Sequence, residues 1–195
     1  MTTFSPDTLK ATLLAKGGIA YNDKYIVIIT KPPLGGADLP GGNDMRRQLS
    51  LLCDTATLPT KSLATYEKSI YGPVKAMPYR MTFTEASMSF IMTDGMAEKH
   101  YFDAWQNMIV DQTSGNIGFF DDYKCDITIK KFSRTAEDTN SGDVTYEVQL
   151  FEAWPSIVSE VQLSHSGGTE AMKLPVTFQF KKWKSSISHP GPKSS

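Results

Sequence analysis

The residues that could carry out chemistry are few and widely spaced along this 195-residue sequence. The three histidines, His100, His165 and His189, do not have the spacing of metal ligands. Asp121 and Asp122 form an acidic doublet that could act as paired catalytic carboxylates. No histidine or second acidic cluster accompanies the doublet, so polar residues at the start of a strand explain it better than an active site does.

Nucleophilic catalysis has no clear candidate either. The sequence contains no Gly-x-Ser-x-Gly motif and no Ser, His and Asp placed to suggest a triad. The two cysteines, Cys53 and Cys125, are too few and too far apart for a metal site, and we expect free, buried thiols. We therefore expect no catalytic, cofactor-binding or metal-binding residues and no enzyme activity.

Composition fits an ordinary soluble domain. A formal net charge of -1 argues against a strongly basic surface for nucleic acid, although a neutral sum can hide a local patch. No apolar run approaches the ~20 residues that a membrane helix needs, and the N-terminus lacks the pattern of a signal peptide. The length suits one domain, which we place over residues 1–183.

The best-defined elements lie between Thr82 and Val110. Met88, Phe90 and Met92 alternate, which predicts a strand with one buried face. After Gly95 the period changes to three and four residues, which predicts a helix over about 94–110 that packs on the sheet. Asp94 is the expected N-cap. The apolar stripe of this helix supplies its expected core anchors, which are Phe102, Trp105, Met108 and Ile109, joined by Tyr101.

The N-terminal half predicts a short helix, strands and a long hairpin. Ser5 is a good N-cap for the helix, with Pro6 at its first position. Two weak, polar strands fit a hairpin that stays exposed until another chain covers it. The expected segments are a helical arm over 1–18, a strand covered on both faces over 25–30, an exposed Gly/Pro-rich loop over 31–44, a strand over 46–56 with Leu49, Leu51 and Cys53 alternating, and the hairpin strands 62–71 and 74–83.

The C-terminal half predicts further antiparallel strands. Alternating residues indicate a strand from Tyr123 and a partner from Val144, and Pro155 is expected to end the partner. The remaining expected segments are a turn over 119–122, a hairpin tip over 135–143, a strand at 157–163, a last strand over 172–183 and a disordered tail over 184–195. The fold class is therefore mainly β, an antiparallel β-sandwich or barrel of about eight strands with one flanking α-helix and a short N-terminal helix.

Several segments together resemble the tail tube proteins of contractile-tailed (myovirus-type) bacteriophages. Each motif is weak alone, but their order and spacing cover roughly residues 5–183. The motifs are the strand and helix of Met88 to Val110 with Tyr101-Phe102-Asp103-Ala104-Trp105-Gln106, the N-terminal helix followed by Ile26 to Thr30, Cys53-Asp54-Thr55-Ala56-Thr57-Leu58-Pro59, Phe151-Glu152-Ala153-Trp154-Pro155 followed by Val161-Gln162-Leu163, and the closing Phe180-Lys181-Lys182-Trp183.

The resemblance implies a structural virion protein that forms stacked six-fold rings of the inner tail tube, the conduit for DNA ejection inside a contractile sheath. The implied partners are further copies of the chain, the tail sheath protein, baseplate and tail-terminator proteins and, transiently in the lumen, the tape measure protein and double-stranded DNA. The protein would be found in the virion tail and assembled in the host cytoplasm, with no cofactor.

Contacts between subunits or rings are hypotheses at this stage. Edge-to-edge joining of sheets would protect strand edges in a ring. The residues expected in subunit or ring contacts are Leu9, Leu13, Leu34, Leu39, Tyr66 and Tyr71. Alternatives are a baseplate tube-initiator subunit, a tube protein of a phage-like contractile injection system and, from another class, a monomeric β-sandwich binding module. An enzyme would instead need a pocket with clustered, perturbed titratable groups.

Overall fold

A computed structural model describes most of the chain. The described residues are 5–15, 19–30, 32, 39–69, 72–133, 144–163 and 171–187. Its helices are α1 (Pro6–Ala15), α2 (Gly42–Leu52), α3 (Ala97–Ile109) and α4 (Phe120–Tyr123). Its strands are β1 (Tyr25–Ile29), β2 (Cys53–Ala56), β3 (Lys61–Lys68), β4 (Lys75–Phe83), β5 (Ala86–Ile91), β6 (Cys125–Phe132), β7 (Val144–Val158), β8 (Lys173–Gln179) and β9 (Lys182–Ile187).

Seven of these strands form one antiparallel sheet. The strand order is β1-β6-β7-β8-β5-β2, and β9 also pairs with β7. The first part of the 15-residue β7 pairs with β6 and β9, and its last part pairs with β8. Glu152 has a φ of 55° between these two parts of β7. The mainly β, antiparallel prediction is confirmed, and the sheet is not closed into a barrel.

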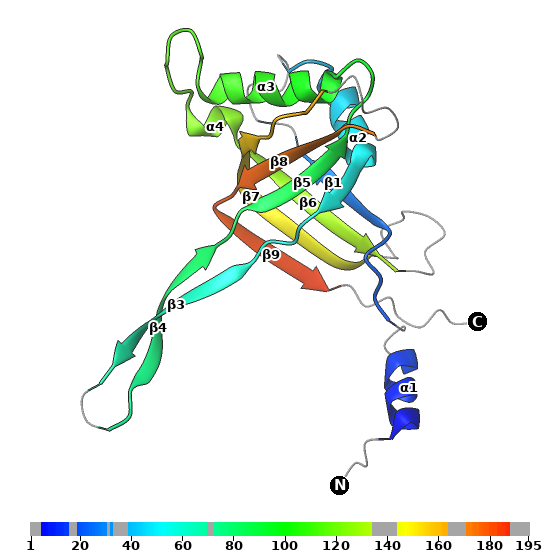
Figure 1. Cartoon of the computed structure of the whole chain (residues 1–195), viewed down its shortest axis with the longest axis vertical. Coiled ribbons are helices and arrows are strands. Elements are labelled where there is room, and N and C mark those ends of the chain that lie inside the picture. The colour runs from blue at the N-terminus through cyan, green and yellow to red at the C-terminus, as the bar shows by residue number, and fades with distance from the viewer. Residues whose placement is uncertain are drawn as a thin grey trace.

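Strands β3 and β4 leave the main sheet and form a separate two-stranded sheet. They project from the body as a long hairpin, at the same end of the molecule as α1 (Figure 1). The prediction of an extended hairpin is therefore confirmed. The core cluster contains no residue of β3 or β4, so the hairpin depends little on the body for its packing.

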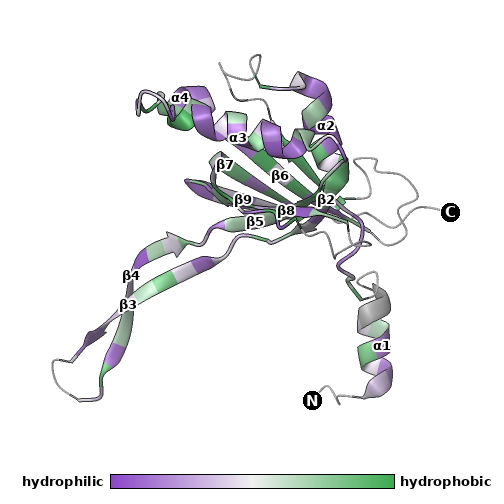
Figure 2. Ribbon diagram, turned by 45° about the horizontal axis from the view of Figure 1, so that its top comes forward, coloured by the Kyte–Doolittle hydropathy of each residue, from purple (hydrophilic) through white to green (hydrophobic). Residues whose placement is uncertain are grey.

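Helices α2 and α3 cover one face of the sheet, and the strands beneath them carry hydrophobic residues (Figure 2). Phe102 and Trp105 of α3 are fully buried, with their rings stacked at 6.4 Å. Trp105 Nε1 donates a hydrogen bond of 2.9 Å to the Tyr123 carbonyl, which ties α3 to α4. Met108 and Ile109 are partly buried against the same core.

The strand predicted over 46–56 is wrong for most of its length, because α2 runs from Gly42 to Leu52. Met45 and Leu49, four residues apart, are buried on one side of this helix, whereas Leu51 is 74% exposed. A short alternation of apolar residues does not by itself separate a strand from a helix. The helix also includes residues 42–44, the end of the loop expected over 31–44.

The N-cap predicted at Asp94 is also wrong. Met96 occupies the N-cap position of α3, with a φ of 49°, and no side chain caps the helix there. Instead, the buried Glu98 carboxylate accepts hydrogen bonds of 3.1 Å from the Thr93 amide and from the Thr93 hydroxyl. The N-cap predicted at Ser5 is confirmed, because Ser5 Oγ accepts a bond of 3.3 Å from the Thr8 amide.

Three strand boundaries differ from the sequence prediction. β7 continues through Pro155 to Val158, because the proline lies where the pairing with β8 is irregular and its missing amide is tolerated. The predicted strand at 157–163 is therefore not a separate element. β9 reaches Ile187, inside the segment predicted as a tail. Tyr123 lies in the short helix α4 rather than in a strand.

Strand β1 is covered on one face rather than two. Val27 and Ile29 are buried, whereas Ile28 is exposed on the other face. The hairpin tip predicted at 135–143 lies outside the described residues.

Candidate assembly surfaces

The groups that could do chemistry are dispersed in the structure. His100 is exposed on α3, and the described part of the chain contains no group of three His, Cys, Asp or Glu that could hold a metal ion. Asp121 forms an ion pair of 2.5 Å with Lys124, and this contact lowers the pKa of the Asp121 carboxyl. Cys53 and Cys125 are free. None of the described helices is long and apolar enough to cross a membrane.

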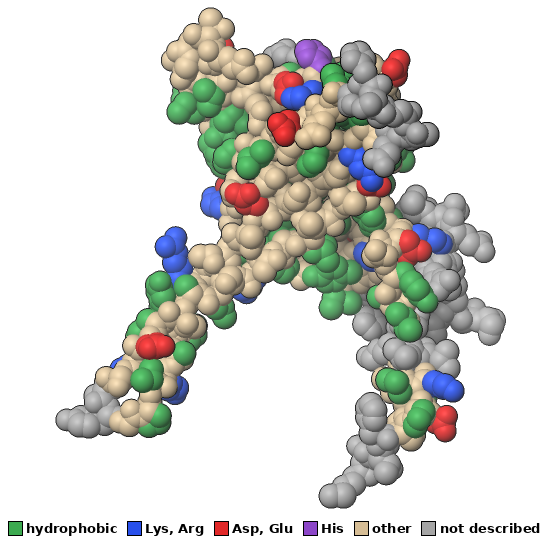
Figure 3. All heavy atoms as spheres, viewed as in Figure 1, with side chains coloured by type: hydrophobic (Ala, Val, Ile, Leu, Met, Phe, Trp, Pro, Cys, Tyr) green, Lys and Arg blue, Asp and Glu red, His purple; other side chains and the backbone are tan. Residues whose placement is uncertain are grey.

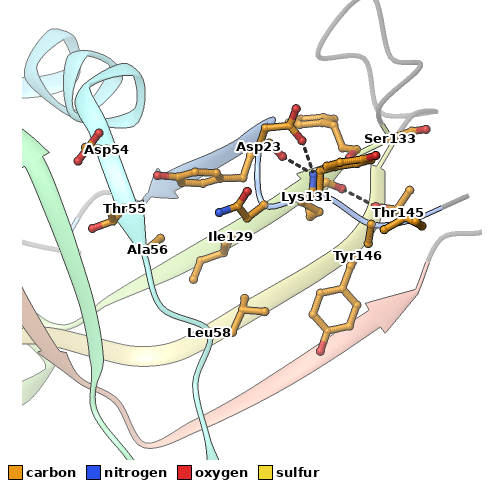
Figure 4. A pocket seen from close by; sticks show the side chains of 16 residues that line it. Asp23, Asp54, Thr55, Ala56, Leu58, Ile129, Lys131, Ser133, Thr145 and Tyr146 are labelled. Carbon is orange, nitrogen blue, oxygen red and sulfur yellow. Dashed lines mark hydrogen bonds and ion pairs between the residues drawn. The ribbon is translucent and has the colours of Figure 1, made fainter.

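A cavity of about 670 Å³ opens between the ends of β1, β2, β6 and β7. Leu58, Ile129 and Tyr146 lie in this opening (Figure 4). Its lysine, Lys131, is held by Asp23, with a distance of 3.7 Å between Nζ and Oδ1. The lining residues include the carboxylates of Asp23 and Asp54 but no histidine or cysteine.

Both faces of the projecting hairpin carry apolar and charged residues. Leu63 and Met81 are paired across the strands and lie on one face, and both are exposed. The opposite face carries Arg80, Tyr66 and the cross-strand pair of Lys68 with Lys75. Tyr79 is 65% exposed at the irregularity in the pairing, in edge contact with Tyr66. Isolated two-stranded hairpins are marginally stable in water, so this exposed apolar surface needs a covering partner.

Helix α1 also stands away from the body (Figure 1). Leu9 on this helix is exposed, which leaves it available for another subunit. Leu39, in contrast, is 4% exposed within the core of its own subunit, so the expectation that it lies in a subunit contact is corrected. The Leu13 side chain, Leu34 and Tyr71 lie outside the described residues.

A second exposed apolar surface, which the sequence reasoning missed, follows α3. We call Val110, Ile117, Phe119 and Phe120 the loop patch. Val110 and Ile117 form an isolated antiparallel bridge, so the two ends of the loop lie side by side. Ile117 is 75% exposed and Phe119 is 82% exposed. The sequence signal was present, because apolar residues here follow a polar turn and fit no helix or strand period.

Carboxylates flank the loop patch in the sequence, and Lys124 Nζ lies 5.5 Å from the centre of the Phe120 ring. Asp111 lies at the start of the loop, and Asp121 and Asp122 follow Phe120 directly. The Asp111 carboxylate accepts bonds from the Ser114 hydroxyl at 2.6 Å and the Thr113 amide at 3.0 Å. These bonds lower the pKa of Asp111, so it is ionised at neutral pH. Figure 3 shows both acidic and basic side chains over the α3 end of the molecule and mostly basic ones on the hairpin.

The sheet offers open strand edges as well. The outer edges of β1 and β2 end the strand order in the described sheet, and β9 pairs with β7 alone. Lysines protect the β9 edge from unwanted pairing, with Lys182 and Lys184 placed over the Phe151 ring at 5.3 and 5.9 Å. The exposed apolar surfaces and open strand edges of the described residues can therefore serve as contact surfaces for another molecule.

Comparison with known proteins agrees with this reading. The sequence matches the model of a family described as phage tail tube protein over residues 20–186. No curated protein sequence matches the chain.

Solved structures with the same fold come from contractile injection systems. A chain of the PVC sheath–tube complex of an extracellular contractile injection system has a TM-score of 0.61 at 12% identity, with 95% of this chain and 100% of that chain covered. A chain of the anti-feeding prophage baseplate has a TM-score of 0.60 at 6% identity, with 87% and 96% covered. A chain of the anti-feeding prophage tube-terminating cap has a TM-score of 0.56 at 15% identity, with 87% and 95% covered.

Proposed function

Because the chain belongs to the phage tail tube protein family, we propose that it forms six-fold rings that stack into the inner tube of a contractile tail. The protein is a structural component of a tail tube, and its family places it in the virion tail. DNA passes through the lumen of the stacked rings during ejection. The tube is assembled in the host cytoplasm and performs no catalysis.

The observation that carries this proposal is the uncovered hairpin of β3 and β4. Leu63, Met81 and Tyr79 expose apolar surface far from the subunit core, where a monomer gains nothing from them. In a ring, neighbouring subunits cover this hairpin, and the open edges of the sheet join between subunits. Tyr66 on the hairpin and Leu9 on α1 are contact residues in this arrangement.

The partners follow from the position of a tube inside a tail. The first partner is a second copy of the chain, and the tube then meets the sheath around it, the baseplate at one end and the terminator at the other. Solved chains with this fold come from a sheath–tube complex, a baseplate and a cap, which supports these partners. A tape measure protein occupies the lumen before the DNA does.

A second candidate is a tube or tube-initiator subunit of a phage-like contractile injection system. It is favoured by the likeness to chains of such systems, including one from a baseplate. An initiator would form single rings, whereas a main tube subunit would form long tubes.

Negative-stain electron microscopy with light scattering of the purified protein tests the proposal. We expect hollow tubes or rings, with the smallest assembly close to six times the 21.6 kDa of one chain. Long open-ended tubes identify the main tube subunit, and single rings identify an initiator. A uniform monomer at high concentration, even with a native baseplate added as a nucleus, would contradict the proposal and favour a monomeric binding module that uses the 670 Å³ cavity.

A further inference from the structure

The link between β5 and α3 contains a dipeptide that can react with itself. Asp94 is followed by Gly95, and no other aspartate or asparagine of the sequence is followed by glycine. The backbone nitrogen after an aspartate can attack the Cγ carbon of that side chain, because the two atoms close a five-membered ring. A glycine leaves this nitrogen open to approach, since it has no Cβ to obstruct the ring.

The structure presents this dipeptide in an exposed turn. Asp94 and Gly95 are both exposed, and the Met96 amide donates a hydrogen bond of 2.9 Å to the Thr93 carbonyl across them. A Cβ placed on Gly95 would meet nothing within 4 Å. Within the described residues, neither Asp94 nor Gly95 forms a hydrogen bond or an ion pair. The carboxyl group and the amide nitrogen are therefore both free to react.

The backbone on either side of the dipeptide is held firmly. The Met92 amide bonds to the Met172 carbonyl at 2.9 Å, beside the pairing of β5 with β8. The amide and the hydroxyl of Thr93 both donate to the buried Glu98 carboxylate at 3.1 Å. A change in backbone length between Thr93 and Met96 therefore cannot be absorbed without breaking some of these bonds.

We propose that Asp94 is a site of spontaneous modification, at which the backbone rearranges to isoaspartate. The Gly95 nitrogen forms a bond to Asp94 Cγ, and its proton leaves with the carboxyl hydroxyl as water, which gives a succinimide ring. Water then adds to one of the two ring carbonyls and breaks its bond to nitrogen. Cleavage at the Cγ carbonyl restores aspartate, and cleavage at the backbone carbonyl gives isoaspartate. The sequence consumes no oxidant or other co-reactant.

Isoaspartate changes the connection of α3 to the sheet. The Cβ carbon of Asp94 becomes part of the main chain, which lengthens the turn by one atom, and the former backbone carbonyl becomes a free carboxylate. The Met96 bond to Thr93 is lost, and the Thr93 bonds to Glu98 are weakened. The modified subunit is therefore less stable at the start of the helix that covers the sheet.

Ageing of the purified protein tests the modification. After weeks at mildly acidic pH, tryptic peptide 81–99 should appear in a second form that has the same mass, elutes separately and is methylated by an isoaspartate methyltransferase. A smaller amount should be lighter by one water, as the succinimide. Peptide 100–124 is the internal control, because its exposed Asp111 is followed by glutamine and its carboxylate is held by Ser114 and Thr113.

Matched variants separate this reaction from general damage. Gly95→Ala should fold normally and slow the rearrangement several-fold, because the added Cβ obstructs the ring. Asp94→Asn should react several-fold faster through the same ring, with loss of ammonia instead of water. Asp94→Glu would need a six-membered ring and should stay unmodified. Urea denaturation of aged wild-type protein should show a lower midpoint than fresh protein, whereas aged Gly95→Ala should keep its midpoint.

Each contrary result overturns a definite step. Isoaspartate that forms only in urea-unfolded protein would show that the folded turn prevents the reaction. Equal rates in the wild type and in Gly95→Ala would overturn the role of the open glycine. Full conversion at Asp94 with an unchanged urea midpoint would overturn the link between this turn and the stability of α3. These measurements are independent of ring formation, so the proposed tube function stands or falls separately.

Discussion

Burial, full at Cys125 and partial at Cys53, raises the pKa of both thiols of this protein. Cys125 is almost fully buried, and burial raises its pKa well above the ordinary value. Burial also raises the pKa of Cys53, from 9.0 to about 11. Only the thiolate reacts with alkylating reagents, so a shift of this size lowers the reactive fraction of Cys53 at neutral pH about a hundredfold.

We therefore predict slow alkylation of both cysteines in the folded protein. With iodoacetamide at pH 7.5, mass spectrometry should show little modification of Cys53 and less of Cys125, and the rate at Cys53 should rise as the pH approaches 11. Unfolding in urea should expose both thiols and make both react quickly. Fast alkylation of the native protein would show that the segment around β2 opens readily.

Glu98 is a buried carboxylate with a structural role. Its Oε2 accepts bonds from the amide and the hydroxyl of Thr93 just before α3. Glu98→Ala should lower the free energy of unfolding by about 1–3 kcal/mol, because it leaves these donors unpaired. Glu98→Gln keeps an acceptor oxygen and should cost less. Urea denaturation compares the two variants, and equal losses would mean that the bonds to Thr93 contribute little.

At the scale of elements, the junction between α3 and the loop patch depends on close backbone packing. A Cβ added at Gly118 would lie 2.5 Å from the Met108 carbonyl oxygen, and the Gly118 amide bonds to the Ile109 carbonyl at 2.9 Å. This close backbone contact of Gly118 with the end of α3 holds the loop patch in place. No side chain larger than hydrogen fits at Gly118 without displacing the loop from the end of the helix.

Gly118→Ala should therefore destabilise the protein by about 1–3 kcal/mol, since the clash involves backbone that cannot move aside easily. Gly95→Ala is the matched control, because a Cβ at Gly95 meets nothing within 4 Å. Thermal or urea unfolding of the two variants measures the difference. A loss at Gly95 as large as that at Gly118 would count against the packing argument.

The sequence predicts secondary structure correctly where one hydrophobic period, of a strand or of a helix, runs through a whole segment. The strand around Met88 to Met92 and the helix of Phe102 and Trp105 are clear in the sequence and present in the structure. The alternation of Leu49, Leu51 and Cys53 covers only five residues, and the segment forms a helix that buries Met45 and Leu49 instead. β9 was missed because its lysines and serines give a strand on the sheet edge no apolar alternation.

The candidate surfaces were predictable only in part. Tyr66 was expected at a contact because weak, polar strands indicate a hairpin that lacks a core, and it is exposed. The burial of Leu39 was not predictable, since the surrounding glycines and prolines hide its place in the fold. Ile117 and Phe119 are apolar residues outside any helix or strand period, but the position of Ile117 beside Val110 comes from the chain reversal and has no local sequence pattern.

At the scale of the whole molecule, the body and the hairpin should be separable. Replacing residues 63–81 with Asn-Gly would join Ser62 and Thr82, which are already paired, by a short turn. The body should keep its melting temperature within ~2 °C, because the core contains no residue of the hairpin. Tubes should be lost. A body that no longer folds, measured by circular dichroism, would contradict this division.

Unlike the hairpin, strand β7 is joined to most of the main sheet, because this one continuous strand pairs with β6, β9 and β8. If β7 separates from β6 and β9, or from β8, the same strand loses hydrogen-bond partners. Neither the β6–β9 side nor the β8 side of the sheet can therefore unfold while the other stays intact. The main sheet should behave as one cooperative unit. In native-state hydrogen exchange, amides of β6, β7 and β8 should share one high protection level set by global unfolding, while those of β3 and β4 exchange much earlier.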